Sequence, residues 1–394
     1  MLNDITTKKI LHLGAGSLMI NNIVLLQKAG YFVCVADKNP DAPAFDVADN
    51  FRAIDIADPE AIFKYARDEN VSAIIAVNDA GVFSAAYASE KLGLTYHSLE
   101  VAKKCTDKGL MREAWLQMNL SQPEFIVVSD VSEIRNAIYK IGIPCIIKPC
   151  LNWGSKGVSA INNEDDISIA IQFALENNRN GRFIIEKLVG GFEVTVEGLV
   201  QNGISKILAR SDKEHQDHAR FKVAMALNYP AKLNESTQYK LDKLIHEAIE
   251  SLGIKNGAFH AECMIDGDEI YLVEMGGRPG GGHIFGYIVE AVSGICMPVA
   301  LASILLNKNL NIEPIFQRGS CYKFFNAPVG VFRGIENLDI AKSSDGILDL
   351  GFKMENGKVV GDIAGDADRP GYIVSSAETR ELAIEKAKAA KNKI

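Results

Sequence analysis

Two carboxylates and one arginine lie close together in the stretch AFHAECMIDGDEIYLVEMGGRPGGG, residues 258–282. Glu262 and Glu274 each belong to an apolar, strand-like run, and Arg278 follows inside a segment of glycines. Glycine lets the backbone come close to a ligand, but its ordering costs more entropy than that of any other residue. Carboxylate oxygens suit magnesium, and a planar guanidinium suits spread negative charge. The stretch therefore predicts a site for an anionic ligand together with a metal ion.

The two carboxylates can share this site only if they lie on one face of a sheet, because side chains alternate between faces along a strand. The residues Asp266 to Asp268 between the two runs predict a hairpin. If all three form the loop, Glu262 pairs with Leu272, and Glu274 is its diagonal neighbour on the same face, about 7–8 Å away. A two-residue turn would place the carboxylates on opposite faces. The alternative interpretation is a pair of acids on an exposed sheet face.

Cations upstream favour the site. Lys148 ends the apolar strand CIIKP, and the loop NWGSKG follows it, with glycines that let backbone N–H groups close over phosphates. Lys108 lies in a helical segment, residues 98–118, for which Ser98 is the expected N-cap. A lysine buried at a strand end normally needs an anionic partner. The lysines and the loop therefore predict a phosphate chain near the carboxylates.

Three kinds of element must position these residues. From Lys9 to about Gly93 strands alternate with helices, which predicts a parallel sheet with helices on both faces. A compact α+β unit with four strands follows the helical connector. From near Gly190 the pattern is antiparallel, with helices near 236–252 and 283–306, and strands and a final helix follow from about 318.

The first glycine turn offers a competing interpretation. GAGSLM, with Asp37 about twenty residues on, partly matches a dinucleotide fingerprint and hence a dehydrogenase. Met19 stands where the third glycine belongs, which weakens that match. Asn78 and Asp79 follow a parallel strand, and we expect them to cap the next helix in preference to binding a ligand.

Composition limits the partners. The chain has 394 residues, 47% of them hydrophobic and 23% charged, with a formal net charge of -8. No basic excess exists to neutralise phosphates, so nucleic acid and anionic membrane surfaces are not expected partners. No apolar run of membrane-spanning length and no secretory signal occurs. Seven scattered cysteines without a C-x-x-C pair favour reduced thiols, mostly core residues, in the cytoplasm.

Taken together, the motifs resemble the ATP-grasp superfamily, and within it the carboxylate–amine ligases that include the bacterial L-amino-acid ligases. The resemblance implies an α/β protein of ATP-grasp architecture. It would have a doubly wound parallel-sheet pre-ATP-grasp domain over 1–107, a connector helix and α+β nucleotide lid over 108–188, and a C-terminal α+β catalytic domain with an antiparallel sheet over 189–394, including a closing segment from about 318. The matching motifs, in chain order, are LGAG through VADKNPDAPAFDVAD, TDKGLMRE, IIKP with GSKG, IIEKLVGGFEVTVEG, HAEC with VEMGGRPGGG, and GDADRPGYIVSSAETRELAIEKA.

The resemblance also implies a role for each matching residue in ATP binding. Lys108 and Lys148 would contact the phosphates, Glu186 and the Leu188 backbone would read the adenine edge, and Glu193 would hold the ribose hydroxyls. The lid loop would add Gly154, Ser155, Lys156 and Gly157.

In the implied reaction, a carboxylate attacks the γ-phosphate to give an acyl phosphate and ADP, and an amine then displaces phosphate to form an amide. Glu262 and Glu274 would bind Mg²⁺, for which Mn²⁺ can substitute, and Arg278 would stabilise the acyl phosphate and its transition state. One departure is Gly276, which stands where many relatives have the asparagine of E-x-N-x-R and leaves open whether one or two magnesium ions bind. The expected substrate contacts are His215, His218, Arg220, His260, Gly280 and Gly281, against the alternatives of a solvated loop for the first three and a packed sheet histidine for His260.

The expected function is thus an ADP-forming carboxylate–amine ligase acting on small molecules, with an amino acid as the expected substrate. A homodimer is an expectation taken from relatives. The alternatives are other ATP-grasp chemistry, namely carboxylation or phosphorylation in the manner of carbamoyl-phosphate synthase, and a nucleotide-binding module without catalysis.

Overall fold

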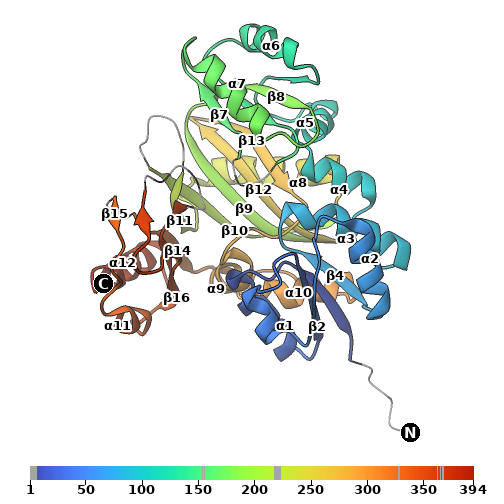
Figure 1. Cartoon of the computed structure of the whole chain (residues 1–394), viewed down its shortest axis with the longest axis vertical. Coiled ribbons are helices and arrows are strands. Elements are labelled where there is room, and N and C mark those ends of the chain that lie inside the picture. Colours follow the sequence, from blue (N-terminus) through green and yellow to red (C-terminus); the bar gives the residue numbers. More distant parts are fainter. Residues whose placement is uncertain are drawn as a thin grey trace.

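The computed structural model describes residues 7–152, 154, 156–216, 223–326, 329–361, 363, 365 and 368–394. Within them, an N-terminal region with a parallel sheet and a lid with its own sheet flank a central antiparallel sheet (Figure 1). The α/β architecture expected from the sequence is present, with a parallel sheet at the N-terminus and antiparallel sheets in the rest.

The N-terminal region is a four-stranded parallel sheet of order β3-β2-β1-β4. Alternate residues of its strands face opposite sides: Ile10 packs in the core that contains α1, whereas Leu11 packs against α2 and α3. Helices therefore cover both faces, as predicted. The elements are β1 (Lys9–Leu13), α1 (Ile20–Lys28), β2 (Phe32–Asp37), β3 (Asn50–Ala53), α2 (Pro59–Asp68), β4 (Ala73–Ala76) and α3 (Asp79–Leu92).

The connector consists of two helices, whereas the sequence predicted one continuous helical segment. Ser98 caps α4 (Leu99–Thr106) by accepting a hydrogen bond from the Val101 N–H, as expected. The break falls at Asp107, which has an extended backbone and accepts from the Leu110 N–H to cap α5 (Lys108–Gln117). The break makes Lys108 the first residue of a new helix.

The lid is a four-stranded antiparallel sheet of order β5-β8-β6-β7, at the top of Figure 1. Its helices share one apolar core with the strands. All four strands were predicted from their apolar runs. The elements are β5 (Phe125–Val128), α6 (Ile134–Ile141), β6 (Cys145–Pro149), β7 (Ser159–Ile161), α7 (Asp166–Glu176) and β8 (Phe183–Lys187).

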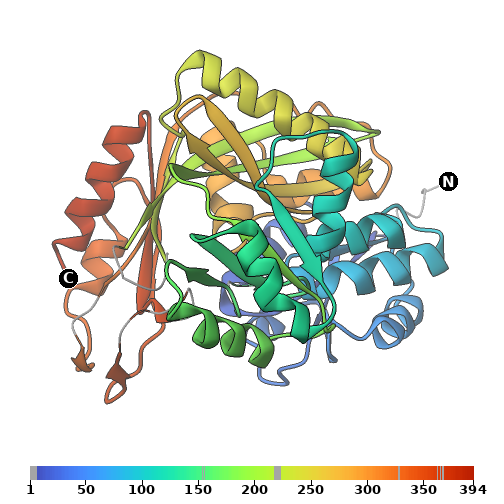
Figure 2. The ribbon, with the colours of Figure 1, turned by 90° about the horizontal axis from the view of Figure 1, so that it is seen from above.

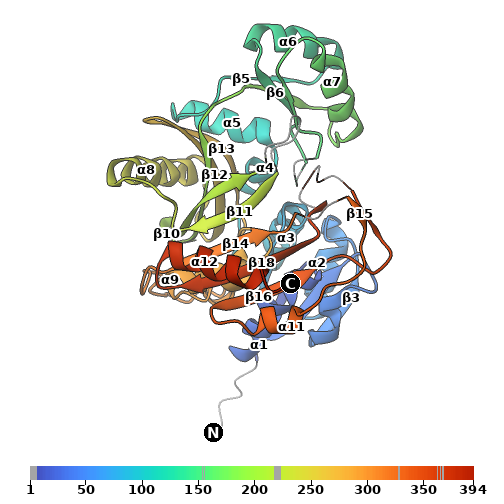
Figure 3. The same ribbon diagram turned by 90° about the vertical axis from the view of Figure 1, so that its left-hand side faces the viewer.

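The central sheet has eight antiparallel strands in the order β13-β12-β9-β10-β11-β14-β18-β16. Helix α8 packs on one face together with α5, while α9 and α10 pack on the other with the N-terminal region. Figure 3 shows α8 beside the central strands and the C-terminal strands far from α6 and α7. The elements are β9 (Phe192–Gln201), β10 (Ile204–His215), β11 (Ala224–Tyr229), α8 (Glu235–Leu252), β12 (Gly257–Asp266), β13 (Glu269–Gly276), β14 (Gly319–Phe324), β16 (Ile347–Phe352) and β18 (Gly371–Ala377).

The single helix predicted over 283–306 is broken. A π-helical turn (Ile284–Ile288) leads into α9 (Val289–Ser293), and α10 (Met297–Leu305) follows after a bend of 104°. Gly294 ends α9 with a φ of 79°, and Pro298 lies in the first turn of α10, where its missing N–H costs nothing. Among the described residues no single helix is long and apolar enough to cross a membrane. The two halves of this bent pair, 284–293 and 297–305, reach the length and apolar composition of a membrane span only when they are taken together.

The C-terminal strands β14, β18 and β16 continue the central sheet, and α12 packs against them. Seen from above, they lie on the opposite side of the molecule from α2 and α3 (Figure 2). Six of the seven cysteines are buried free thiols, as predicted for core residues. The remaining elements are β15 (Gly330–Val331), α11 (Leu338–Lys342), β17 (Val359–Val360) and α12 (Arg380–Lys391).

Candidate nucleotide and substrate site

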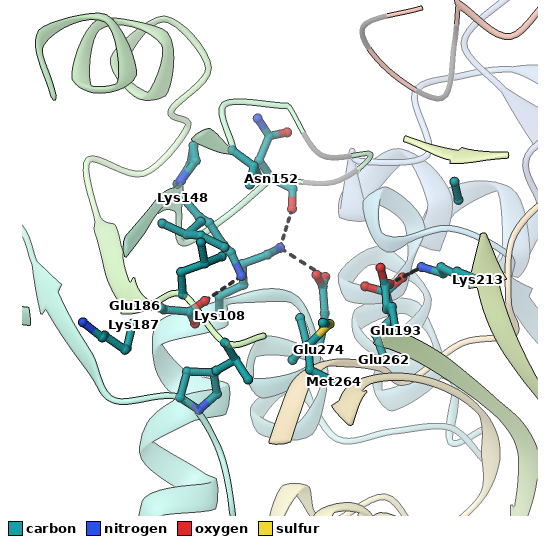
Figure 4. A pocket seen from close by; sticks show the side chains of 18 of the residues that line it. Lys108, Lys148, Asn152, Glu186, Lys187, Glu193, Lys213, Glu262, Met264 and Glu274 are labelled. Atoms are coloured by element: carbon teal, nitrogen blue, oxygen red, sulfur yellow. Dashed lines mark hydrogen bonds and ion pairs between the residues drawn. The ribbon is translucent and has the colours of Figure 1, made fainter. Parts of the chain in front are cut away.

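Two cavities meet at the predicted carboxylates. The first, of about 250 Å³, lies between the lid and the central sheet (Figure 4). The second, of about 350 Å³, lies between the N-terminal region, the central sheet and the C-terminal strands. Glu262, Glu274 and Lys213 line both. The first cavity is lined by these predicted residues: Lys108, Lys148, Gly154, Lys156, Glu186, Leu188, Glu193, His215, Glu262 and Glu274.

Glu262 and Glu274 lie directly opposite each other on β12 and β13. The predicted register was wrong in detail, because Asp266 pairs with Glu269 and leaves a two-residue turn. Such a turn alone would put the carboxylates on opposite faces. A β-bulge corrects this: Cys263 pairs with Leu272 and Glu262 with Glu274, so Val273 is the extra residue.

Glu262 already has a cationic partner, Lys213 of β10. The Lys213 ammonium lies 2.7 Å from a Glu262 oxygen and also binds Glu193, which accepts a second hydrogen bond from His215 at 2.9 Å if that ring nitrogen is protonated. Burial lowers the pKa of Lys213, but the two carboxylates outweigh it, so the net pKa is raised. Burial raises the pKa of Glu262, yet Lys213 and His260 bring it well below its ordinary value. The sequence prediction missed Lys213.

Lys108 joins the lid loop to the other carboxylate. Its ammonium donates to the Asn152 carbonyl at 2.9 Å and to Glu274 at 3.1 Å (Figure 4). Burial lowers the pKa of Lys108, but Glu274, Asp79 and Glu186 together outweigh it, so the net pKa is raised and the lysine stays charged. Each of the two central carboxylates therefore faces one buried ammonium.

Lys148 is bound to Glu186 at 2.6 Å, and Arg112 of α5 binds the other Glu186 oxygen at 2.7 Å. Burial raises the pKa of Glu186, but the two cations outweigh burial and bring the pKa from the ordinary 4.5 down to about 2. Arg112 also donates to the carbonyls of Leu272 and Val273, at 2.8 and 3.0 Å. This arginine, which the sequence prediction missed, thus stabilises the bulge that aligns the carboxylates.

Arg278 lies in the second cavity, bound in bidentate fashion to Asp79 at 2.9 and 2.7 Å. Asn78 caps α3 by accepting from the Gly81 N–H, as expected. The expectation that Asp79 would also be a cap was wrong, because both of its oxygens accept hydrogen bonds from Arg278. Asp79 comes from the N-terminal region and Arg278 from the loop after β13, 199 positions later.

The glycines around Arg278 make room for side chains from three other elements. An added Cβ would lie 3.0 Å from His97 at Gly277, 2.6 Å from Glu197 at Gly280 and 2.7 Å from the Tyr322 hydroxyl at Gly282. Nothing lies within 4 Å of such an atom at Gly281, which lines the second cavity, whereas Gly280 does not line it. Most of these glycines therefore serve close packing, and Gly281 is the one that leaves space beside the cavity.

His260 lines the second cavity with its ring bound to the buried Glu197 at 2.6 Å. Burial lowers the pKa of His260, but Glu197 and Glu262 raise it to about 9. In the lid loop, Gly157 is buried against Pro149 and Asn177, where a Cβ would come within 2.8 Å of each. Three predicted residues, Ser155, His218 and Arg220, lie outside the described part of the chain.

The donor set suits a magnesium ion that also binds phosphate. Among the described residues no three His, Cys, Asp or Glu side chains are grouped to hold a metal by themselves. Two carboxylates directly opposite each other are present, however, and magnesium is commonly held by one or two carboxylates with water and substrate phosphates. Glu262 and Glu274 would supply these oxygens.

In the first glycine turn, the acid of the partial fingerprint is bound by backbone groups of the protein itself. Asp37, the acid of the partial dinucleotide fingerprint, accepts hydrogen bonds from the backbone N–H groups of Ala15 and Asn39, both at 2.9 Å. Its carboxylate orders the turn after β1. The geometry gives the dehydrogenase alternative no support.

Comparison with known proteins agrees with this geometry. An ATP-grasp domain model matches residues 141–286, and a model for L-amino acid ligase C-terminal domain 2 matches residues 323–394. The chain therefore contains a domain of the ATP-grasp family, followed by an L-amino acid ligase C-terminal domain 2. The predicted class of enzyme, an ADP-forming ligase that makes carbon–nitrogen bonds, is confirmed at the level of this family.

Individual relatives of this ATP-grasp chain differ in substrate. Formate-dependent phosphoribosylglycinamide formyltransferase from Proteus mirabilis is 28% identical over 277 residues, which cover 69% of this chain and 68% of the relative. An L-amino acid ligase from Bacillus licheniformis has the same fold, with a TM-score of 0.84, 19% identity and 98% of each chain covered. An N5-carboxyaminoimidazole synthetase from Staphylococcus aureus, solved with ADP, has a TM-score of 0.77, 18% identity and coverage of 97% and 96%.

Proposed function

We propose that this ATP-grasp ligase joins a carboxylate to an amine through an acyl phosphate, releasing ADP and phosphate, with an amino acid as one substrate. The observation that carries the proposal is the position of Glu262 and Glu274 in the wall shared by two cavities. One cavity is suited to a nucleotide and the other to the acid and the amine. The γ-phosphate would lie where the two cavities meet, because phosphoryl transfer depends mainly on positioning the reacting groups and neutralising their charge.

The first cavity fits the roles expected for ATP. Lys108 and Lys148 provide two cations for the phosphates, and Lys156 and Gly154 of the lid loop line the same space. Leu188 follows β8 beside Glu186 and lines the cavity, as a hinge residue that binds adenine would. Glu193 would hold the ribose hydroxyls; it lines the same cavity, and Lys213 and His215 are bound to its carboxylate. The residue roles, the three domain boundaries and the use of Mg²⁺ or Mn²⁺ are parts of this proposal.

Magnesium bound by Glu262 and Glu274 would neutralise phosphate charge and orient the γ-phosphate. Arg278 lies in the second cavity, where a planar guanidinium can stabilise the acyl phosphate and the charge that develops when phosphate leaves. The substrate carboxylate would lie beside Gly281, where an open backbone borders the cavity. No nucleophilic side chain is needed, because the substrates supply both nucleophiles.

An amino acid is supported by the C-terminal region. Residues 323–394 match the L-amino acid ligase model, and Phe324, Lys353 and Arg369 from this region line the second cavity. Leu227, Ile284 and Tyr322 add apolar and aromatic surface on the same wall. A cavity of about 350 Å³ with mixed apolar and charged walls is of the size expected for a small metabolite.

A second candidate is a one-carbon acid. The formyltransferase from Proteus mirabilis, similar over about two thirds of both chains, is formate-dependent by name. The same active-site arrangement could form an acyl phosphate from formate. A binding module without catalysis is less well supported, because Glu262 and Glu274 line both cavities and Arg278 lines the second. Carboxylation and phosphorylation in the manner of carbamoyl-phosphate synthase would use the same residues, and no further observation favours them.

A screen of phosphate release tests the proposal. The protein is incubated with ATP and Mg²⁺ and with pairs of amino acids, or with formate and one amine, and each active mixture is analysed by mass spectrometry. Release that needs both partners, with a product lighter by one water than their sum, would support an amide ligase. If no pair stimulates release although ATP raises the melting temperature, the ligase proposal fails for these substrates. The homodimer and the cytoplasmic location belong to the same proposal, and light scattering after size exclusion tests the first.

A further inference from the structure

We infer that Asp79 is a positioning residue for the reaction: it fixes the orientation of the Arg278 guanidinium, so that the N-terminal region completes the catalytic centre. The inference rests on the proposed function of Arg278. It concerns a residue of the first domain that would contact Arg278 and not the reacting phosphoryl group.

The hydrogen bonds define the guanidinium orientation. Arg278 donates through Nε and Nη2 to the two oxygens of Asp79, and through Nη1 to the Pro279 carbonyl at 3.0 Å. A guanidinium has five N–H groups in one plane. These three bonds therefore leave one N–H on each terminal nitrogen for a ligand in the second cavity.

The ion pair between Arg278 and Asp79 is largely buried, so each charge depends on the other. The side chains of Arg278 and Asp79 are only 14% and 12% exposed. Without Asp79, the guanidinium would be a buried charge that turns toward Glu274 of the predicted magnesium site or toward Glu197, because both carboxylates already stabilise its charged form. Asp79 thus keeps the arginine away from the carboxylates of the predicted magnesium site.

Gly276 restricts the arginine from the other side. A Cβ at this position would lie 3.3 Å from Arg278 Cγ and 3.4 Å from Cζ and Nε, so the side chain lies directly over the glycine. The residue that replaces the asparagine of E-x-N-x-R therefore provides the surface against which the guanidinium packs. Asp79 and Gly276 together fix both its direction and its plane.

The pair could instead be a purely structural bridge between domains, and Arg210 and Asp242 provide a matched control. They form the same bidentate contact, at 2.7 and 2.6 Å, but line neither of the two cavities. A structural role for Asp79 predicts that Asp79→Asn and Asp242→Asn affect stability alone. A positioning role predicts that only Asp79→Asn lowers turnover.

The test uses the full chain and low millimolar guanidinium chloride, far below denaturing concentrations, as a probe. In Arg278→Ala, the free guanidinium ion should bind Asp79, raise the melting temperature and restore part of the turnover. It should do neither in the double variant Asp79→Asn with Arg278→Ala. Equal effects in both variants would overturn the inference. The melting-temperature arm needs no substrate, so it decides on Asp79 even if the amide-ligase proposal fails.

Turnover provides the second arm, with the substrate pair found by the phosphate-release screen. Asp79→Asn should lower kcat by about 10- to 100-fold, as expected for loss of an outer-shell partner, with the KM for ATP unchanged. Asp242→Asn should keep the wild-type kcat. Wild-type kcat in Asp79→Asn would contradict the inference, as would an active charge-swap variant (Asp79→Arg with Arg278→Asp), which restores the bridge without the guanidinium.

Discussion

Glu262 on β12 and Glu274 on β13 lie directly opposite each other because Val273, the residue before Glu274, is an extra, bulged residue without a partner on β12. Arg112 donates to the carbonyls of the bulged Val273 and of Leu272 before it, and binds Glu186 with its remaining nitrogen. The bulge in the edge strand β13 therefore determines whether the carboxylates of Glu262 and Glu274 share one face of the sheet.

Replacing Arg112 should weaken both the fold and the metal site. Arg112→Met leaves two carbonyls of β13 without their donor and Glu186 with one cation, so the free energy of unfolding should fall by about 3–5 kcal/mol. The same change should increase the Mg²⁺ concentration needed for half-maximal activity, because Glu274 loses its support. Urea unfolding and a Mg²⁺ titration measure the two effects, and an unchanged Mg²⁺ requirement would show that the bulge does not depend on Arg112.

Arg278→Ala should lose turnover and keep nucleotide binding. Removing one group that stabilises transition-state charge typically costs about 100- to 1000-fold in kcat. ATP should still raise the melting temperature as in the wild type, since Arg278 lines only the second of the two cavities. Steady-state kinetics and thermal shift are the measurements. Full turnover in the variant would remove Arg278 from the catalytic role.

Lys213→Met should change how the protein responds to magnesium without nucleotide. The lysine binds both Glu193 and Glu262, and its loss leaves two buried carboxylates near each other. The variant should melt below the wild type, and Mg²⁺ alone should raise its melting temperature more than that of the wild type. Equal Mg²⁺ shifts in both proteins would mean that Lys213 does not compete with the metal for Glu262.

The Glu186 charge should give the fold a defined pH dependence. Its pKa is lowered from the ordinary 4.5 to about 2, so its contribution to stability is complete above pH 4.5 and is lost as the pH falls toward 2. Wild type should therefore exceed Glu186→Gln in stability at neutral pH, and the difference should shrink between pH 4.5 and 2. Denaturation at several pH values measures this, and a constant difference would contradict the assignment.

The strands and most helices could be predicted because their apolar periodicity is local, as in CIIKP and FEVTVEG. Helix breaks at Asp107 and Gly294 were missed, since each depends on one capping residue within an otherwise helical pattern. Lys213 was missed because a β-bulge, which the local sequence does not show, sets the register of its strand. Continuing the pairing of Ile204 with Gln201 would put it opposite Phe192, but a bulge between Ile207 and Ala209 shifts the register by one residue.

The predicted nucleotide and metal residues do converge, because each ends or borders a recognisable apolar run. Their partners were not foreseeable in the same way. Asp79 and Arg112 act on residues 199 and up to 161 positions away, so only the fold brings them together. Local sequence contains no signal for such pairs beyond an unexplained charge in an apolar context.

The ammonium groups of Lys108 and Lys213 lie against the carboxylates of Glu274 and Glu262, respectively. The site therefore contains its own counter-ions. If a magnesium nucleotide binds here as proposed, Glu262 and Glu274 would exchange the lysines for the metal, and the lysines would pair with phosphate oxygens. In that exchange the number of buried charges without a partner would not increase, so the fold would hold a highly charged site both with and without the nucleotide.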